Sequence, residues 1–110
     1  MARSPRTVWE TLITLPAILR PAADADIQAT HDELEQSQAG LGDRFVDRVR
    51  EVLERIESMP EMYSLVWQDV RAARLRKFRH LVYYVVFADR VEVLAVMHGS
   101  RDAPAWQSRV

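Results

Sequence analysis

The chain has 110 residues, of which 48% are hydrophobic and 28% charged, a composition typical of one small globular domain. It contains no cysteine, which excludes disulfides and thiolate metal sites. No apolar run approaches the roughly 20 residues that a membrane-spanning helix needs. Glu10 and other polar residues interrupt the apolar N-terminal stretch, so we expect no signal peptide and a cytoplasmic protein.

The net charge of −1 hides an uneven distribution of charge along the chain. Residues 1–69 hold 7 Arg against 13 Asp and Glu, a net charge of −6, whereas residues 70–110 hold 7 Arg and 1 Lys against 3 acids, a net charge of +5. A basic face that meets nucleic acid or an acidic protein would produce this asymmetry. Neutralisation of one half by the other within the fold would also produce it, and the sequence leaves both explanations open.

The N-terminal part is interpreted as an extension over residues 1–10, followed by a single domain over residues 11–110. The segment Thr11 to Arg20 is rich in β-branched and apolar residues and predicts a strand. Pro16 cannot donate a backbone hydrogen bond, so this strand is expected to lie at a sheet edge, to be bulged, or to be short.

Two helices are predicted next. Pro21 suits the first turn of a helix, because the N–H group that proline lacks has no partner there. Gly40 is expected to adopt a left-handed conformation where this helix ends. The segment from Asp43 to Met59 carries a wide apolar stripe at three- and four-residue steps, and Pro60 ends it. The two helices would form an antiparallel hairpin.

The remainder of the chain is predicted to be β structure, after a loop over residues 61–69. The strands are expected at residues 70–78, 80–89 and 91–98. The middle strand is apolar on both faces, which is typical of a strand covered on both sides. The order β-α-α-β-β-β predicts an α+β fold in which a helical hairpin packs on a small antiparallel sheet.

Three segments of the chain, in order, resemble the RelE/ParE family of toxins from bacterial toxin–antitoxin pairs. They are "GLGDRF", "VYYVVFADRVEVLAV" and "HGSRDAPAW", and the resemblance covers about residues 17–109. It implies the fold just described and a toxin held inactive by a cognate, ParD-like antitoxin in a hetero-oligomer. The chain departs from the family pattern at Glu33–Leu34, where an aromatic pair is common, and at Phe78–Arg79, where Phe-Pro is usual.

The family divides by target. RelE-like members cleave messenger RNA in the ribosome, which needs an acid, a base and cations. The candidates for such a reaction here are Arg76, Lys77, His98 and Arg101. ParE-like members poison DNA gyrase and perform no chemistry. The scarcity of lysine and the absence of a late tyrosine make the chain resemble the ParE-like branch more closely, so we expect growth inhibition through gyrase. A ribosome-dependent endoribonuclease and a degenerate toxin that only binds antitoxin remain alternatives.

The residues expected to contact the antitoxin or the target are basic, with one aromatic addition: Arg74, Arg76, Arg79, Arg101 and Trp106. Arg74 and Arg76 are expected on one strand face, because alternate residues of a strand share a face. Each of these residues also has a structural alternative. Arg74 could lie on a solvated edge, and Arg101 could form a salt bridge to Asp102. Trp106 could pack over the sheet as a lid.

Three further expectations concern the histidines and tyrosines. His98 could titrate near neutral pH or could hold the turn after the last strand. Tyr83 and Tyr84 point to opposite faces, so at most one lies near the basic residues. The three histidines lie far apart and show no ligand spacing. We therefore expect no metal and no cofactor, and neither a membrane nor a specific nucleic-acid sequence as a partner.

Overall fold

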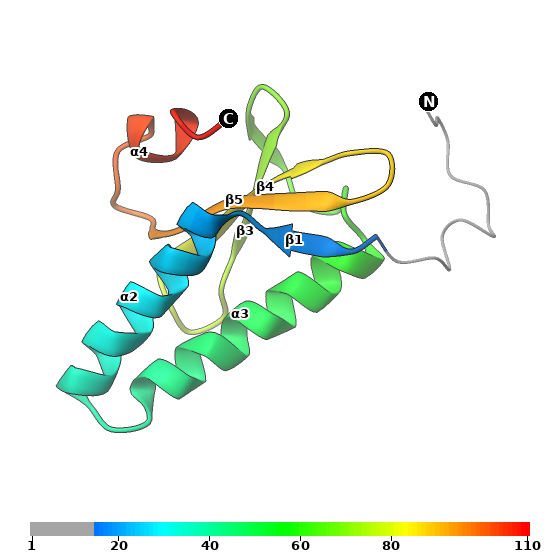
Figure 1. Cartoon of the computed structure of the whole chain (residues 1–110). Helices are drawn as coiled ribbons and strands as arrows, with labels where there is room; N and C mark the ends of the chain where they lie inside the picture. Colours follow the sequence, from blue (N-terminus) through cyan, green and yellow to red (C-terminus); the bar gives the residue numbers. More distant parts are fainter. Residues whose placement is uncertain (1–14) are drawn as a thin grey trace.

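The computed structural model describes residues 15–110, so the predicted extension and the first part of the predicted N-terminal strand lie outside the described residues. Within residues 15–110, no helix is both long enough and apolar enough to cross a bilayer. The elements are, in order, β1 (Ala17–Leu19), α2 (Pro21–Ser37), α3 (Leu41–Ser58), β2 (Leu65–Trp67), β3 (Val70–Arg74), β4 (His80–Val86), β5 (Val91–His98) and α4 (Pro104–Gln107) (Figure 1).

The strands form one sheet in the order β1-β5-β4-β3-β2. All neighbours run antiparallel except β1 and β5, which pair in parallel from Ala17 opposite Val91 to Leu19 opposite Val93. The predicted α+β fold with its helical hairpin is confirmed, and the sheet is mixed where we expected an antiparallel one. The helical hairpin follows β1, and a long connection of this kind allows parallel pairing with a later strand.

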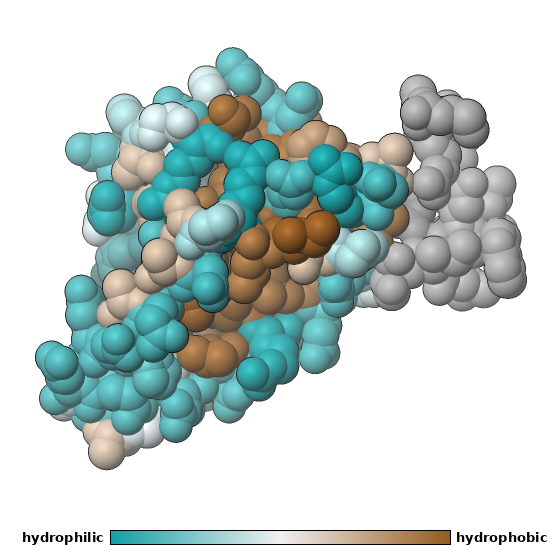
Figure 2. Space-filling view, in the orientation of Figure 1, coloured by the Kyte–Doolittle hydropathy of each residue, from teal (hydrophilic) through white to brown (hydrophobic). Residues whose placement is uncertain are grey.

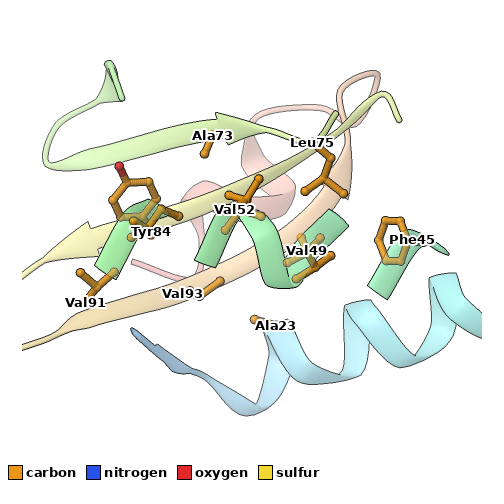
Figure 3. Close-up of a cluster of buried hydrophobic side chains, with 12 residues drawn as sticks. Ala23, Phe45, Val49, Val52, Ala73, Leu75, Tyr84, Val91 and Val93 are labelled. Carbon is orange, nitrogen blue, oxygen red and sulfur yellow. The ribbon is translucent and has the colours of Figure 1, made fainter. Parts of the chain in front are cut away.

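The sheet is covered on both faces, which explains the apolar character of β4. The hairpin of α2 and α3 packs on one face, where Phe45, Val49 and Val52 of α3 meet Tyr84 and other apolar residues of the strands (Figure 3). Trp106 of α4 packs on the opposite face, with Tyr83 among its neighbours. The outer surfaces of the two helices are hydrophilic, whereas apolar residues gather between them (Figure 2).

The hairpin begins and turns where the sequence predicted. Pro21 is the first residue of α2, and Gly40 has a φ of +86°, in the left-handed region, at the start of α3. Gly42 then lets the two helices approach each other closely. A Cβ atom at this position would lie 2.4 Å from the carbonyl oxygen of His31 and 2.7 Å from Cγ of Glu35. Only glycine fits this position without a shift of α2 or α3.

Three boundaries in the β region differ from the prediction. The strand predicted over residues 80–89 ends at Val86. The predicted loop over residues 61–69 contains the short edge strand β2. The strand predicted over residues 70–78 ends at Arg74, because the amide of Leu75 donates to the carbonyl of His80 at 3.0 Å and closes a turn. Arg76 and Lys77 therefore lie in this β3–β4 turn. The prediction that Arg74 and Arg76 share a strand face is wrong, because only Arg74 belongs to the strand.

Candidate binding surface

One end of the sheet carries a groove where β3 stops, β4 starts and β5 ends. Its volume is about 410 Å³, and we call it the basic groove; it is lined by Arg74, Arg79, Leu81, His98, Gly99 and Ser100. Arg74 pairs in register with Leu81, and His80 pairs with His98, so the sheet itself brings these residues together. The side chains of Arg74 and Arg79 are exposed and form no ion pair among the described residues. The groove therefore presents two unneutralised guanidinium groups to solvent.

Hydrogen bonds of the turn after β5 fix the wall of the basic groove. The amide of Gly99 donates to the carbonyl of Arg79 at 2.7 Å, and the amide of Ser100 donates to Nδ1 of His98 at 3.0 Å. His98 thus holds the turn, one of its two predicted roles, but as an acceptor. Because Nδ1 accepts, the proton of the neutral ring lies on Nε2. His98 therefore offers a donor at Nε2.

His80 supports His98 from behind. The two ring centroids are 5.3 Å apart, and the His80 ring also packs edge-on against Phe45 at 5.0 Å. Its Nδ1 atom is buried and has no hydrogen-bond partner among the described residues. Burial, and next the positive charge that His98 can carry, lower the pKa of His80. Because His80 is neutral, the positive charge at this end of the sheet comes from arginines such as Arg74 and Arg79.

Arg101 lies on the other side of His98 from the basic groove. It shares a pocket of about 220 Å³ with Glu33, His80, His98 and neighbouring residues. Among the described residues Arg101 forms no ion pair, so the alternative of a salt bridge to Asp102 is not seen. Arg101 is a third arginine beside His98 that forms no ion pair among the described residues.

Arg76 and Lys77 point away from the basic groove, towards α3. Arg76 lies 3.4 Å from a carboxylate oxygen of Glu51. Lys77 lines a separate pocket of about 320 Å³, which we call the turn pocket; its other lining residues are Leu41, Arg44, Arg48 and Phe78. Of the four residues considered for RNA cleavage, His98 and Arg101 share a pocket, and Arg76 and Lys77 lie apart from them within the described part of the chain.

The contribution of Arg44 and Arg48 to the turn pocket was not predicted. One signal was present in the sequence: the two arginines stand four residues apart on one helix, where like charges repel each other. Such a pair is unfavourable for the helix alone, and Arg48 is paired with Glu51 at 2.6 Å.

Comparisons with known proteins agree with this architecture. Residues 17–103 match the family described as "ParE toxin of type II toxin-antitoxin system, parDE". The chain belongs to the ParE toxin family. The predicted resemblance to RelE/ParE toxins, closer to the ParE-like branch, is therefore confirmed. A comparison with curated protein sequences finds no match.

A solved structure has the same fold as this ParE-family chain. It is described as the chromosomal ParDE toxin–antitoxin system from P. aeruginosa, and it superposes with a TM-score of 0.69 at 13% sequence identity. The match covers 77% of this chain and 96% of the other. At this identity the likeness concerns the fold.

Two aromatic residues that drew attention in the sequence are packing residues in this ParE-family chain. Trp106 is only 6% exposed and stacks on Tyr83, with ring centroids 4.5 Å apart. It covers the sheet as a lid, so we leave it out of the contact surface. Tyr84 is buried on the opposite face, where its hydroxyl donates to the carbonyl of Pro60 at 2.7 Å, and burial raises its pKa to about 12. The prediction that the two tyrosines occupy opposite faces is confirmed.

The C-terminal segment is anchored by contacts that the sequence did not reveal. The guanidinium of Arg109 donates to both carboxylate oxygens of Asp26, at 2.6 and 3.2 Å, and to the carbonyl of Leu94 at 3.1 Å. Asp26 also accepts from the amide of Val96 on β5 at 3.0 Å. This clasp ties the end of the chain to α2 and to the edge of β5 beyond the end of β1.

Proposed function

We propose that the protein is a toxin that inhibits bacterial growth through DNA gyrase in the cytoplasm, and that a cognate antitoxin neutralises it. Membership of the ParE family supports the toxin role. The observation that carries the choice of mechanism is the separation of Arg76 and Lys77 from His98 and Arg101. Cleavage of RNA on the ribosome needs its acid, base and cations around one phosphodiester. Among the described residues His98 and Arg101 share one pocket, whereas Lys77 lines another and Arg76 pairs with Glu51.

The basic groove, together with Arg101, is the proposed contact surface. Arg74, Arg79 and Arg101 are exposed and surround His98 without carboxylate partners among the described residues. Guanidinium groups bind carboxylates and phosphates with paired hydrogen bonds. An acidic segment of the antitoxin that covers this surface would neutralise its charge and block the target from it.

The function is tested by producing the protein alone in bacteria and examining gyrase and messenger RNA in the same cells. We expect gyrase–DNA cleavage products to accumulate when purified protein is added to gyrase and DNA. In the cells, translated messages should stay intact. Cleavage of messages at codon boundaries, with gyrase unaffected, would instead assign the ribosome as the target. If a short reading frame beside the gene encodes an antitoxin, growth arrest should be relieved when that antitoxin is produced together with the protein.

The contact surface is tested with Arg74→Glu and Arg79→Glu. Both side chains are exposed at the end of the sheet, so the variants should fold with an unchanged thermal midpoint. We expect each reversal of charge to weaken antitoxin binding at least tenfold, because an attraction becomes a repulsion. Unfolding of the variants would mean that these arginines are structural.

A further inference from the structure

The turn pocket lies on the helix side of the β3–β4 turn and is separate from the basic groove. Two of its walls are apolar, Leu41 at the start of α3 and Phe78 in the turn. Phe78 is held in place, because its ring packs edge-on against the buried ring of Phe45 with centroids 5.4 Å apart. The pocket therefore has a fixed apolar wall beside three cationic side chains.

The positive charge around the turn pocket exceeds what the chain neutralises. Arg48 donates to Glu51 at 2.6 Å, and Arg76 approaches the same carboxylate oxygen at 3.4 Å. The hydrogen bond from Arg48 is the main cause that lowers the pKa of Glu51. Arg44 and Lys77 are exposed and have no ion pair among the described residues. Glu51 thus pairs with Arg48 and Arg76, and Arg44 and Lys77 are left without a carboxylate partner among the described residues.

The backbone of Lys77 adds a second observation. Its φ is +66°, in the left-handed region where a non-glycine residue costs roughly 1–2 kcal/mol. Turn geometry accounts for the conformation itself, since Gln68 adopts it as well at φ +50°. It does not account for a lysine, because glycine or asparagine adopts this conformation at lower cost. The lysine places a cation in the lining of the pocket.

We propose that the turn pocket anchors the antitoxin, by accepting an apolar or aromatic side chain that is flanked by carboxylates. This inference rests on the proposed function and names the chemistry of the partner. The apolar side chain would pack between Leu41 and Phe78, and the carboxylates would pair with Arg44 and Lys77. A volume of about 320 Å³ is near the lower end of ligand pockets, roughly 300–1,000 Å³, and suits one side chain.

The position of the pocket fits one continuous acidic segment. Arg74 and Arg79 flank the β3–β4 turn on the side of the basic groove, and Lys77 and Phe78 lie within that turn on the side of α3. A segment that crosses the turn would meet the basic groove first and the turn pocket next. The apolar walls favour a peptide over a nucleic-acid backbone, whose phosphates gain nothing from burying Leu41 or Phe78.

The first experiment measures the binding of a synthetic, fluorescein-labelled peptide with a central phenylalanine between runs of three glutamates. The full-length protein is titrated at physiological salt, and fluorescence polarisation is recorded. We expect Arg44→Glu and Lys77→Asn to weaken binding at least tenfold, and a peptide with serine in place of phenylalanine to bind at least tenfold more weakly. Asparagine tolerates the left-handed conformation, so Lys77→Asn removes the charge while keeping the turn.

The matched control is Arg55→Glu. Arg55 lies on the same helix about three turns after Arg44, is exposed, and has no ion pair among the described residues. Its reversal should change peptide binding less than twofold. An equal loss in Arg55→Glu, or no loss in the pocket variants, overturns the proposal. Displacement of the peptide by a thymidine oligonucleotide as readily as by unlabelled peptide would also overturn it, because the site would then recognise any polyanion.

The second experiment separates this inference from the proposed function. The cognate antitoxin is co-produced with wild-type protein and with each pocket variant, and the affinity of the purified pairs is measured. If the antitoxin neutralises the wild type and binds the pocket variants equally well, the pocket is not the anchor and the toxin role stands. If no antitoxin neutralises the wild type, the proposed function fails. Should Arg44→Glu unfold, Arg44→Gln replaces it and a tenfold loss is still expected.

Discussion

At the scale of single residues, His31 links the two helices through charge. Its Nδ1 atom lies 3.0 Å from a carboxylate oxygen of Asp32, and its Nε2 atom lies 3.0 Å from one of Asp43 on α3. Both ring nitrogens face acceptors, an arrangement that only the protonated imidazolium satisfies with two donors. The hydrogen bonds to Asp32 and then to Asp43 raise the pKa of His31.

This arrangement predicts a pH-dependent contribution of His31 to stability. Because the folded pKa lies above the unfolded value of 6.5, the contribution is complete below that value and is lost as pH rises through the folded pKa. We expect His31→Gln to lower the thermal midpoint most at pH 5.5, with a difference that shrinks steadily towards pH 8.5. Thermal scans of both proteins across this range provide the measurement. A difference that does not depend on pH would show that packing, and not charge, is lost.

A second prediction at this scale concerns Tyr84. Removing its hydroxyl in Tyr84→Phe leaves the buried carbonyl of Pro60 without its donor, which should cost about 1–3 kcal/mol of unfolding free energy. Tyr83→Phe is the matched control, because the Tyr83 hydroxyl has no hydrogen bond among the described residues and its ring still stacks on Trp106. Urea unfolding should place Tyr83→Phe within about 0.5 kcal/mol of the wild type. Equal losses in the two variants would contradict the role of the Tyr84 hydrogen bond.

At the scale of elements, the approach of α2 and α3 depends on Gly42. A methyl group there would meet the His31 carbonyl oxygen at 2.4 Å, so Gly42→Ala must push the helices apart and should cost roughly 1–3 kcal/mol. Gly40→Ala is the comparison, because it meets nothing within 4 Å and suffers only from its φ of +86°, a cost of roughly 1–2 kcal/mol. The two variants separate by structure: Gly42→Ala should shift the amide resonances of both helices, and Gly40→Ala only those of the loop. Widespread shifts in Gly40→Ala would refute this distinction.

How far the elements follow from sequence depends on whether the signal is local. Pro21, Gly40 and the alternation of Tyr83 and Tyr84 act through their own backbone or through the period of one strand, and all three were predicted correctly. The end of β3 at Arg74 was missed, because a turn hydrogen bond sets it and the residues that follow are still compatible with a strand.

The candidate surface was harder to predict than the fold, for the same reason. Arg74 and His98 come together because β3, β4 and β5 are neighbours in the sheet, and Arg79 directly precedes β4. The turn pocket joins Arg44 of α3 to Lys77 of a turn, and such a meeting depends on how the helices sit on the sheet. Sequence periodicity carries no information about that placement.

At the scale of the whole molecule, the clasp between Arg109 and Asp26 joins the last residues of the chain to its first helix. The two side chains are 26% and 17% exposed, and both also bond to the backbone of β5. Removing one partner leaves a partly buried charge without its counter-ion. The resulting loss of unfolding free energy exceeds the loss from breaking an ion pair on the surface. The clasp therefore contributes to the position of the whole C-terminal segment, including α4.

We expect Arg109→Ala and Asp26→Asn each to cost roughly 1–3 kcal/mol of unfolding free energy, less than for a fully buried pair because solvent screens both groups. The double variant should cost clearly less than the sum of the two, since the second change removes a partner that is already lost. Urea unfolding of the four proteins gives this coupling energy, and hydrogen exchange at the Val96 amide reports on the β5 edge directly. Additive losses would mean that each residue acts alone. The carboxylate of Asp26, and not the guanidinium of Arg109, accepts the hydrogen bond of the Val96 amide. We therefore expect faster exchange at this amide in Asp26→Asn and a smaller change in Arg109→Ala.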